Sequence, residues 1–124
     1  MAVTWKQYSG VWTMQSQMQA VSAGTWTGFP YLWSWGYNPF GQLGLDNVTY
    51  YSSPKQVGAL TNWSSVSCGG LYTVSIKTDG TLWSWGYNAN GELGQGNTTN
   101  YSSPKQVGAL TNWLSVSCGS THTV

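Results

Sequence analysis

The sequence predicts an all-β protein built from a repeated unit. Its 124 residues include 16 glycines and 9 tryptophans, so turns and large flat side chains dominate the composition. Short runs that alternate polar and apolar residues lie between glycine-rich segments, which is the pattern of strands joined by tight loops. The third observation is an internal repeat, and it sets the size of the unit.

The repeat has a period of 50 residues. Leu-Trp-Ser-Trp-Gly-Tyr-Asn at 32–38 returns at 82–88. Residues 31–74 align with 81–124 without a gap and share 32 identities in 44 positions. We therefore expect three parts: a leader at 1–31 that ends in a degenerate strand, a first repeat at 32–81, and a second, truncated repeat at 82–124.

Each repeat carries signals for about four short strands. Residues 71–76 and 81–85 flank an Asp-Gly turn, which predicts a hairpin. Residues 63–68 form a further strand, and Pro54 is tolerated only at the start of a strand or at the edge of a sheet, because it lacks an N–H. This density of strands with glycine-rich connections predicts the blades of a β-propeller. A β-solenoid is the alternative, although its coils are usually shorter.

The repeated motifs resemble the regulator of chromosome condensation repeat, over residues 31–124. Tyr72 stands where the family usually has His, a departure that we expect to affect packing rather than function. The resemblance implies propeller blades, and the family closes them into a seven-bladed ring. The matching residues are Trp35-Gly36-Tyr37-Asn38, Gly41, Leu43-Gly44, Pro54, Val57, Val66, Gly69 and Thr73-Val74, then Trp85-Gly86-Tyr87-Asn88, Gly91, Leu93-Gly94, Pro104, Val107, Val116, Gly119 and His122-Thr123-Val124.

The small charge inventory argues against several classes of function. Four lysines without arginine cannot form the cationic patch that neutralises phosphates, so we expect no nucleic-acid partner. Only three carboxylates are present, too few for most acid–base or oxygen-rich metal chemistry. We therefore expect no enzyme activity, no catalytic residues, no metal site and no cofactor. No apolar run is long enough to span a bilayer, so we expect no membrane insertion.

Four groups of side chains have predicted roles. His122 is the only histidine and is expected to be a buried, hydrogen-bonded residue. Cys68 and Cys118 occupy equivalent positions, so we expect two buried strand residues that do not form a disulfide. The strand tryptophans are expected to pack between blades, the alternative being glycan stacking if one face is exposed: Trp33, Trp35, Trp83 and Trp85. Loop aromatics are the candidate partner contacts, with rim packing as their alternative role: Tyr37, Phe40, Tyr50, Tyr51, Tyr87 and Tyr101.

The leader at 1–31 is the candidate anchor. Val11, Met14, Met18 and Val21 fall at helical spacing, whereas alignment to the repeat makes 20–24 a strand. We expect the leader to dock on a partner, a frayed cap being the alternative. Its anchoring side chains are Trp5, Tyr8, Trp12, Met14 and Met18.

The predicted function is structural. The best-known family member is a nucleotide-exchange factor for the GTPase Ran, but its specialised loops and acidic contacts have no counterpart here. Near-identical repeats and polar loops look like those of bacterial and bacteriophage members. We expect a virion component, in the head, neck or tail fibre, that is held to other virion proteins by 1–31 and displays its loops to a host protein or glycan. The alternative is a cytoplasmic protein-interaction propeller.

The two repeats are fewer than the roughly four blades that a propeller needs to close. We expect that the sequence belongs to a longer chain. The alternative is a homo-oligomer in which copies complete one another, with the leader or residues 31–35 pairing to the open edge of the next copy.

Overall fold

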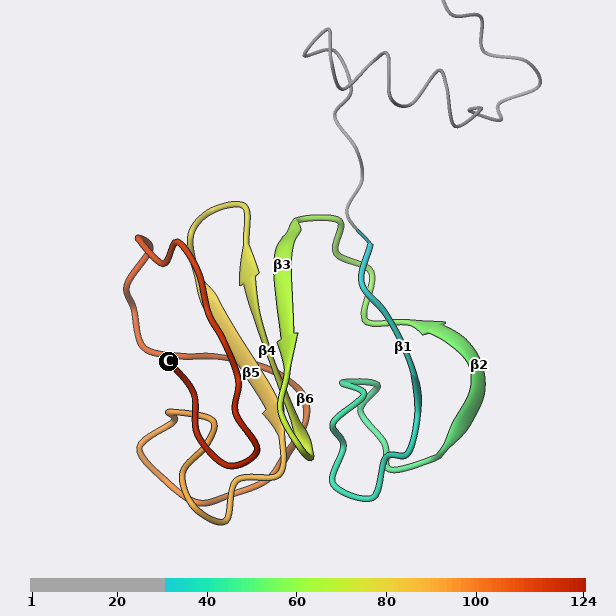
Figure 1. The fold of residues 1–124 in the computed structure, drawn as a ribbon. Coiled ribbons are helices and arrows are strands. Elements are labelled where there is room, and N and C mark those ends of the chain that lie inside the picture. The colour runs from blue at the N-terminus through green and yellow to red at the C-terminus, as the bar shows by residue number, and fades with distance from the viewer. Residues whose placement is uncertain (1–30) are drawn as a thin grey trace, which may run out of the picture.

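The computed structural model describes residues 31–124 and shows six β-strands (Figure 1). No residue of this part is helical, which confirms the predicted all-β class, and it therefore holds no helix of the length and apolarity that crossing a membrane requires. The strands are β1 (Trp33–Gly36), β2 (Tyr51–Gln56), β3 (Trp63–Cys68), β4 (Tyr72–Lys77), β5 (Leu82–Gly86) and β6 (Tyr101–Gln106).

The strands form one complete blade and part of another. β3, β4, β5 and β6 make a four-stranded antiparallel sheet in sequence order, and β1 pairs with β2 in a separate two-stranded sheet. Because β1 and β2 lie 50 residues before β5 and β6, they are the outer half of a preceding blade. The complete blade takes β3 and β4 from the first sequence repeat and β5 and β6 from the second.

The predicted hairpin joins β4 to β5. Asp79 accepts hydrogen bonds from the Thr81 amide and hydroxyl, at 3.0 and 2.6 Å, and the Gly80 amide donates to the Lys77 carbonyl. The Thr81 bonds hold the pKa of Asp79 below its usual value. Gly80 has a φ of 79°, and a Cβ there would collide with the Thr111 carbonyl, so no other residue fits this turn.

The proline-containing strands lie at the outer edge of each sheet, which is one of the two positions predicted for a proline. Within residues 31–124, β2 pairs only with β1 and β6 only with β5. The register of each pair shifts next to the proline, between Ser34 and Gly36 and between Ser84 and Gly86. A residue without an N–H is accommodated there because an edge strand needs no second partner.

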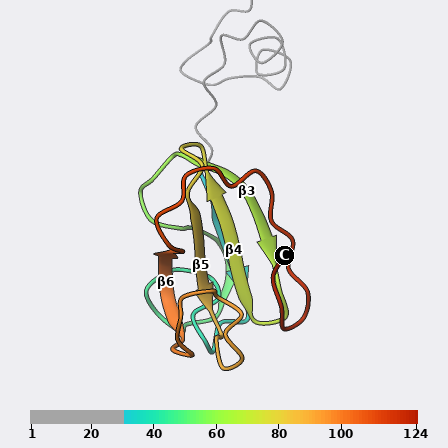
Figure 2. The ribbon, with the colours of Figure 1, turned by 90° about the vertical axis from the view of Figure 1, so that its left-hand side faces the viewer.

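The core of the blade lies between its sheet and the C-terminal segment. Tyr72, Val74, Ile76 and Leu82 of the sheet are buried together with Leu93 of the loop that follows β5. Val107, Val116 and Cys118 pack against them. The β1–β2 unit lies on the opposite side of the sheet from the C-terminal segment (Figures 1 and 2), so the complete blade is stacked between two neighbours.

The C-terminal residues repeat the first pair of strands in the blade. The Ser117 and Val124 backbones exchange two hydrogen bonds, at 2.8 and 2.9 Å, and Cys118 forms a bridge with Thr123. These pairs lie 50 residues after Ser67–Val74 and Cys68–Thr73 of the β3–β4 pair. Residues 113–124 are therefore the inner half of a following blade.

Tyr72 links this half-blade to the complete blade. Its hydroxyl donates to the carbonyls of Gly119 and His122 and accepts from the Thr123 hydroxyl. The side chain is only 2% exposed. The family's usual His at this position is thus replaced by a residue with a packing role, as predicted.

Removal of this hydroxyl should loosen the C-terminal half-blade. Tyr72→Phe keeps the ring but deletes its hydrogen bonds, so the free energy of unfolding should fall by about 1 kcal/mol. Hydrogen–deuterium exchange should accelerate at the amides of Ser117, Gly119 and Val124. Tyr37→Phe, which removes an exposed hydroxyl, is the control and should leave these amides unchanged. Equal exchange in Tyr72→Phe and the unmodified protein would contradict the link.

Candidate functional site

The two long loops lie at the same end of the blades. Residues 37–50 join β1 to β2, and residues 87–100 join β5 to β6. Both loops extend below the sheets in Figure 1, whereas the shorter turns at 57–62 and 78–81 lie at the opposite end. Loops gathered at one end of a rigid sheet scaffold are the usual place for a binding surface.

A buried asparagine organises the first loop. The Asn38 side chain is 0% exposed. Its Nδ2 donates to the carbonyls of Asn47 and Thr49, at 3.0 and 3.1 Å, and its Oδ1 accepts from the Leu43 amide at 2.9 Å. One side chain therefore ties three points of the loop together, and it replaces the regular backbone hydrogen bonds that a loop lacks.

The second loop is built in the same way. Asn88 is also fully buried. Its Nδ2 donates to the carbonyls of Asn97 and Thr99, both at 2.9 Å, and its Oδ1 accepts from the Leu93 amide at 3.0 Å. We call each of these arrangements an asparagine clamp. Because both clamps are complete, the two loops have closely similar frameworks despite differing side chains.

Each clamped loop also binds the next blade along the chain. The Gln42 carbonyl accepts hydrogen bonds from the Thr73 hydroxyl at 2.8 Å and from the Trp85 indole N–H at 2.9 Å. The Glu92 carbonyl accepts from the Thr123 hydroxyl at 2.9 Å. The same carbonyl position thus joins consecutive blades in both repeats.

The side chains of Gln42 and Glu92 each accept hydrogen bonds from within their own loop. Gln42 Oε1 accepts from the Phe40 amide at 3.1 Å, and the Glu92 carboxylate accepts from the Asn90 amide and side chain at 2.9 and 2.8 Å. Burial disfavours the charged form of Glu92, but the Asn90 and backbone hydrogen bonds outweigh this effect and hold its pKa below the ordinary value. The carboxylate is therefore occupied in loop structure.

Tyr37 and Tyr50 form an exposed pair at the two ends of the first loop. Their ring centroids are 5.0 Å apart with an interplanar angle of 49°, and the side chains are 59% and 58% exposed. Partial desolvation and the neighbouring Tyr37 hydroxyl raise the pKa of Tyr50. The Tyr50 phenol is therefore neutral at physiological pH and can donate a hydrogen bond.

Phe40 and Tyr87 form a second pair that crosses between the loops. Their centroids lie 4.8 Å apart in an edge-to-face arrangement of 63°, and both are half-buried. We name the four residues of the two pairs the aromatic end: Tyr37, Phe40, Tyr50 and Tyr87.

The two other predicted contact residues, Tyr51 and Tyr101, begin the outer strands β2 and β6 and hold the ends of the loops. The hydroxyls of Tyr51 and Tyr101 accept from the side chains of Asn47 and Asn97, at 3.3 and 3.1 Å. Lys55 and Lys105 lie over their rings, with the ammonium nitrogens 5.3 and 5.2 Å from the centroids. The structure therefore places the six predicted contacts in two groups, four at the aromatic end and two at the start of the outer strands.

Comparison with known proteins places these features in a family. The regulator of chromosome condensation (RCC1) repeat matches residues 31–76 and 79–124, and a second form of the same repeat matches 63–92. The chain belongs to the RCC1 repeat family. Comparison with curated proteins found no match.

Solved propellers share its fold. Human WBSCR16 superimposes with a TM-score of 0.67 and 26% identity, covering 77% of this chain. Prp20p from Saccharomyces cerevisiae, in a structure concerned with its binding to Gsp1p and histones, gives a TM-score of 0.66 at 20% identity over 77% of this chain. Yeast RCC1 (Prp20) bound by Kap60 gives 0.56 at 18% identity over 94%. The RCC1-family chain spans only 26 to 30% of these proteins.

The predicted packing of the tryptophans holds for the complete blade only. Trp85 is 1% exposed, and its ring lies 5.7 Å from Trp63. Trp83 is half-buried. The prediction is wrong for Trp33 and Trp35, which are 50% and 58% exposed, because no sheet among residues 31–124 covers the outer face of β1.

Three further predictions of burial are wrong for the same reason. His122 and Cys68 are exposed, and Cys118 is half-buried. Each of these positions is buried only by a neighbouring blade, and residues 31–124 supply that neighbour incompletely. The cysteines are free, as predicted.

The predicted anchor residues, Trp5, Tyr8, Trp12, Met14 and Met18, lie outside the described residues.

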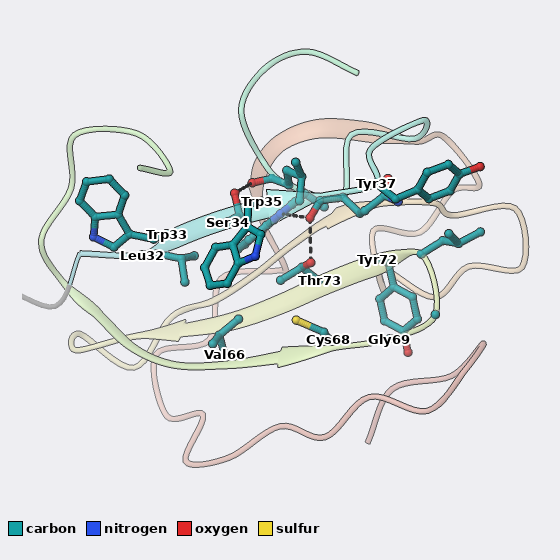
Figure 3. Close-up of a pocket in the computed structure, with 15 residues that line it drawn as sticks. Leu32, Trp33, Ser34, Trp35, Tyr37, Val66, Cys68, Gly69, Tyr72 and Thr73 are labelled. Atoms are coloured by element: carbon teal, nitrogen blue, oxygen red, sulfur yellow. Dashed lines mark hydrogen bonds between the residues drawn. The ribbon is translucent and has the colours of Figure 1, made fainter. Parts of the chain in front are cut away.

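A cavity of about 380 Å³ lies beside β1 (Figure 3). One wall is formed by Leu32 and the β1 residues 33–35, and the other by Val66, Cys68, Tyr72 and Thr73 of β3 and β4. Consecutive strand residues point to opposite faces, so the cavity surrounds the strand edge rather than one face. Among residues 31–124, no cluster of three His, Cys, Asp or Glu side chains could hold a metal ion.

Lys77 is a feature that sequence reasoning missed. It is 4% exposed, and its ammonium nitrogen lies 3.5 Å from the Trp83 ring centroid and 4.9 Å from that of Trp63. Both tryptophan rings therefore form cation–π interactions with the Lys77 ammonium group. Burial lowers the pKa of Lys77, and the nearby Asp79 partly opposes this effect. Only the strand register, Trp63 opposite Lys77 and Ser75 opposite Trp83, could have revealed this cage.

The Lys77 environment predicts a pH dependence of stability. The folded pKa lies below the value of 10.5 in the unfolded chain, so between the two values the unfolded state binds more protons. The free energy of unfolding contributed by Lys77 should therefore rise as pH approaches 10.5. Denaturant unfolding at pH 7 and pH 10 should show that the unmodified protein gains stability relative to Lys77→Met. Lys105→Met controls for loss of one charge, and the same pH effect in both variants would contradict the interpretation.

Proposed function

We propose that this RCC1-family chain is a non-enzymatic protein-binding module that contacts its partner through the aromatic end. The observation that carries the proposal is the presence of two aromatic pairs in the loops at one end of the blades: Tyr37–Tyr50 within the first loop and Phe40–Tyr87 between the two loops. Tyrosine and phenylalanine are enriched in the cores of protein interfaces.

The rigidity of the loops favours binding. The asparagine clamps fix both loops before any partner arrives, so little conformational entropy is lost on association. The exposed tyrosines offer flat apolar rings together with hydroxyl groups. Such side chains supply large contact areas with few rotatable bonds.

The family supports a protein partner in general terms. Prp20p is described with Gsp1p, histones and Kap60, all of which are proteins. Those partners are not transferred here, because the likeness at 18 to 20% identity covers only part of Prp20p. The small number of charges in this chain also favours an aromatic interface over an electrostatic one.

The carboxylates support a non-enzymatic role. Asp79 is engaged by Thr81 in a turn, and Glu92 by Asn90 in a loop. His122, the only histidine of the chain, is exposed on the C-terminal half-blade. His122 and Glu92 line one cavity with Thr121 and Thr123, but the Glu92 carboxylate is already bound to Asn90.

A finer assignment rests on the sequence. We place the protein in a bacteriophage virion, as a head, neck or tail-fibre component held to other virion proteins by residues 1–31. Near-identical repeats with polar loops and little charge suit an outward display of the aromatic end to a host protein or glycan. The second candidate is a cytoplasmic propeller that binds a cellular protein through the same residues.

A paired substitution tests the aromatic end. Tyr37→Ser with Tyr50→Ser removes both exposed rings without touching either clamp, and affinity for a protein partner should fall at least about tenfold. Tagged protein is incubated with extracts of its source, and stoichiometrically bound proteins are identified and titrated. Leu60→Ser with Leu110→Ser is the matched control, since these leucines are 51% and 60% exposed in the turns at the other end.

The identity of the bound protein separates the two assignments. Particle or host-surface proteins support the virion role, and a cellular protein supports the cytoplasmic alternative. Binding that survives loss of both tyrosines, or that falls equally in the leucine control, would contradict a contact through the aromatic end.

A further inference from the structure

The two long loops share a framework but present different surfaces. Residues 51–63 and 101–113 are identical, whereas 39–50 and 89–100 differ at seven of twelve positions. The residues of the asparagine clamps are the same in both loops, so these differences change what a loop presents rather than how it folds. Three of them concern us here: Asp46 in place of Gly96, Val48 in place of Thr98, and Tyr50 in place of Asn100.

These three positions are exposed beside either neighbouring blade. Asp46, Val48 and Tyr50 are exposed in the first loop, which has the following blade alongside it. Their counterparts at 96, 98 and 100 are exposed in the second loop, which has the preceding blade alongside it. The positions therefore belong to the propeller surface whichever blades come before or after.

Asp46 places a charge on the first loop at a cost in backbone conformation. Its φ is 59°, a left-handed value that disfavours a side chain, and the second loop has Gly96 there with a φ of 72°. The Asp46 amide donates to the Ser102 carbonyl at 2.9 Å, which fixes this backbone against β6. Asp46 is the only exposed charged side chain of the two long loops, because Glu92 is buried.

Tyr50 replaces a residue that stabilises the second loop. There, the Asn100 Oδ1 accepts a hydrogen bond from the Asn88 amide at 2.8 Å. Tyr50 has no amide oxygen to repeat this bond, and its ring lies against Tyr37 instead while remaining 58% exposed. At both positions the first loop thus gives up a stabilising feature for a functional group at the surface, which is the pattern of a binding site.

We propose that the partner presents a basic segment to the first loop, with a lysine or arginine cation over the Tyr50 ring and Asp46 as its counter-charge. This inference rests on the protein-binding role proposed above and adds the chemistry of the partner. The faces of aromatic rings attract cations, and Val48, 57% exposed, offers apolar contact to the aliphatic stem of such a side chain.

The cation for Tyr50 has to come from outside residues 31–124. The three lysines of this part already lie over other rings: Lys55 over Tyr51, Lys77 over Trp63 and Trp83, and Lys105 over Tyr101.

The clamp holds Asp46 and Tyr50 at a fixed separation. The two residues flank 47–49, and Asn38 binds the carbonyls of Asn47 and Thr49. Four residue steps span at most about 14 Å even when fully extended, so one short peptide can reach both. The loop therefore offers its ring and its carboxylate to the same segment of a partner.

Peptide titration of the full chain tests this recognition. The probe is an acetylated and amidated peptide in which three arginines alternate with glycine, and the matched control carries neutral citrulline in place of each arginine. Amide shifts in two-dimensional NMR should change at Asp46, Val48 and Tyr50, and the arginine peptide should bind at least about fivefold more tightly. Equal affinities, or an absence of shifts at these three residues, would overturn the proposal.

Two variants separate the ring from the charge. Tyr50→Leu keeps an apolar side chain but removes the π face, so arginine-peptide binding should weaken about threefold. Asp46→Asn keeps a side chain that tolerates left-handed backbone but removes the charge, so binding should weaken about twofold to threefold and depend less on salt. Leu60→Ser with Leu110→Ser, at the other end of the blades, is the control and should bind normally. Unchanged affinity in either single variant would contradict the role given to that side chain.

Asp46→Gly adds a readout of stability. Glycine suits the positive φ, so the thermal unfolding midpoint should rise by about 2 to 4 °C while arginine-peptide binding weakens as in Asp46→Asn. A lower midpoint would show that Asp46 stabilises the loop, and would overturn the argument that it is retained for binding.

The protein partner of the aromatic end separates failure of this inference from failure of the proposed function. Loss of its binding in Tyr37→Ser with Tyr50→Ser, but not in Tyr50→Leu or Asp46→Asn, would leave the proposed function standing and overturn the recognition of a cation. Binding that survives the paired serine substitution contradicts the proposed function itself.

Discussion

The buried asparagine clamp is the constraint on which the rest of the structure depends. Asn38 and Asn88 each fix a long loop at three backbone points, and a loop fixed in this way aims the carbonyl of Gln42 or Glu92 at the next blade. That carbonyl accepts hydrogen bonds from Thr73 and Trp85 in one case and from Thr123 in the other. Loop conformation and blade stacking are therefore set by one interaction.

The same geometry positions the aromatic end. Because consecutive loops are held in equivalent conformations, Phe40 of one loop reaches Tyr87 of the next at 4.8 Å, and Tyr37 and Tyr50 meet across the ends of a single loop. The sheets contribute no side chain to these pairs. Their part is to hold the loops at a constant spacing, which is how a propeller converts repetition into a continuous surface.

Local patterns were sufficient to predict the strands but not their environment. The Asp-Gly turn at 79–80 and the proline of each outer strand specify the hairpin and the edges through backbone chemistry alone. The burial of Cys68, His122 and Trp35 depends instead on a neighbouring blade, and no local pattern reports whether a neighbour is present. The sequence also could not distinguish Tyr37 from Tyr51. Tyr37 is exposed and Tyr51 is bound to Asn47, and this difference arises only from the folded conformation of the loop.

The most direct test of the clamp is the free energy of unfolding of Asn38→Ala, measured with amide exchange at Leu43. Loss of the side chain leaves three backbone groups without their partner, so we expect destabilisation of about 2 to 4 kcal/mol and rapid exchange of the Leu43 amide. Thr49→Ala, which keeps the backbone carbonyl that Asn38 binds, is the matched control and should change little. A cost below about 0.5 kcal/mol, within the range of ordinary surface substitutions, with Leu43 still protected, would show that the loop and the blade contact do not depend on Asn38.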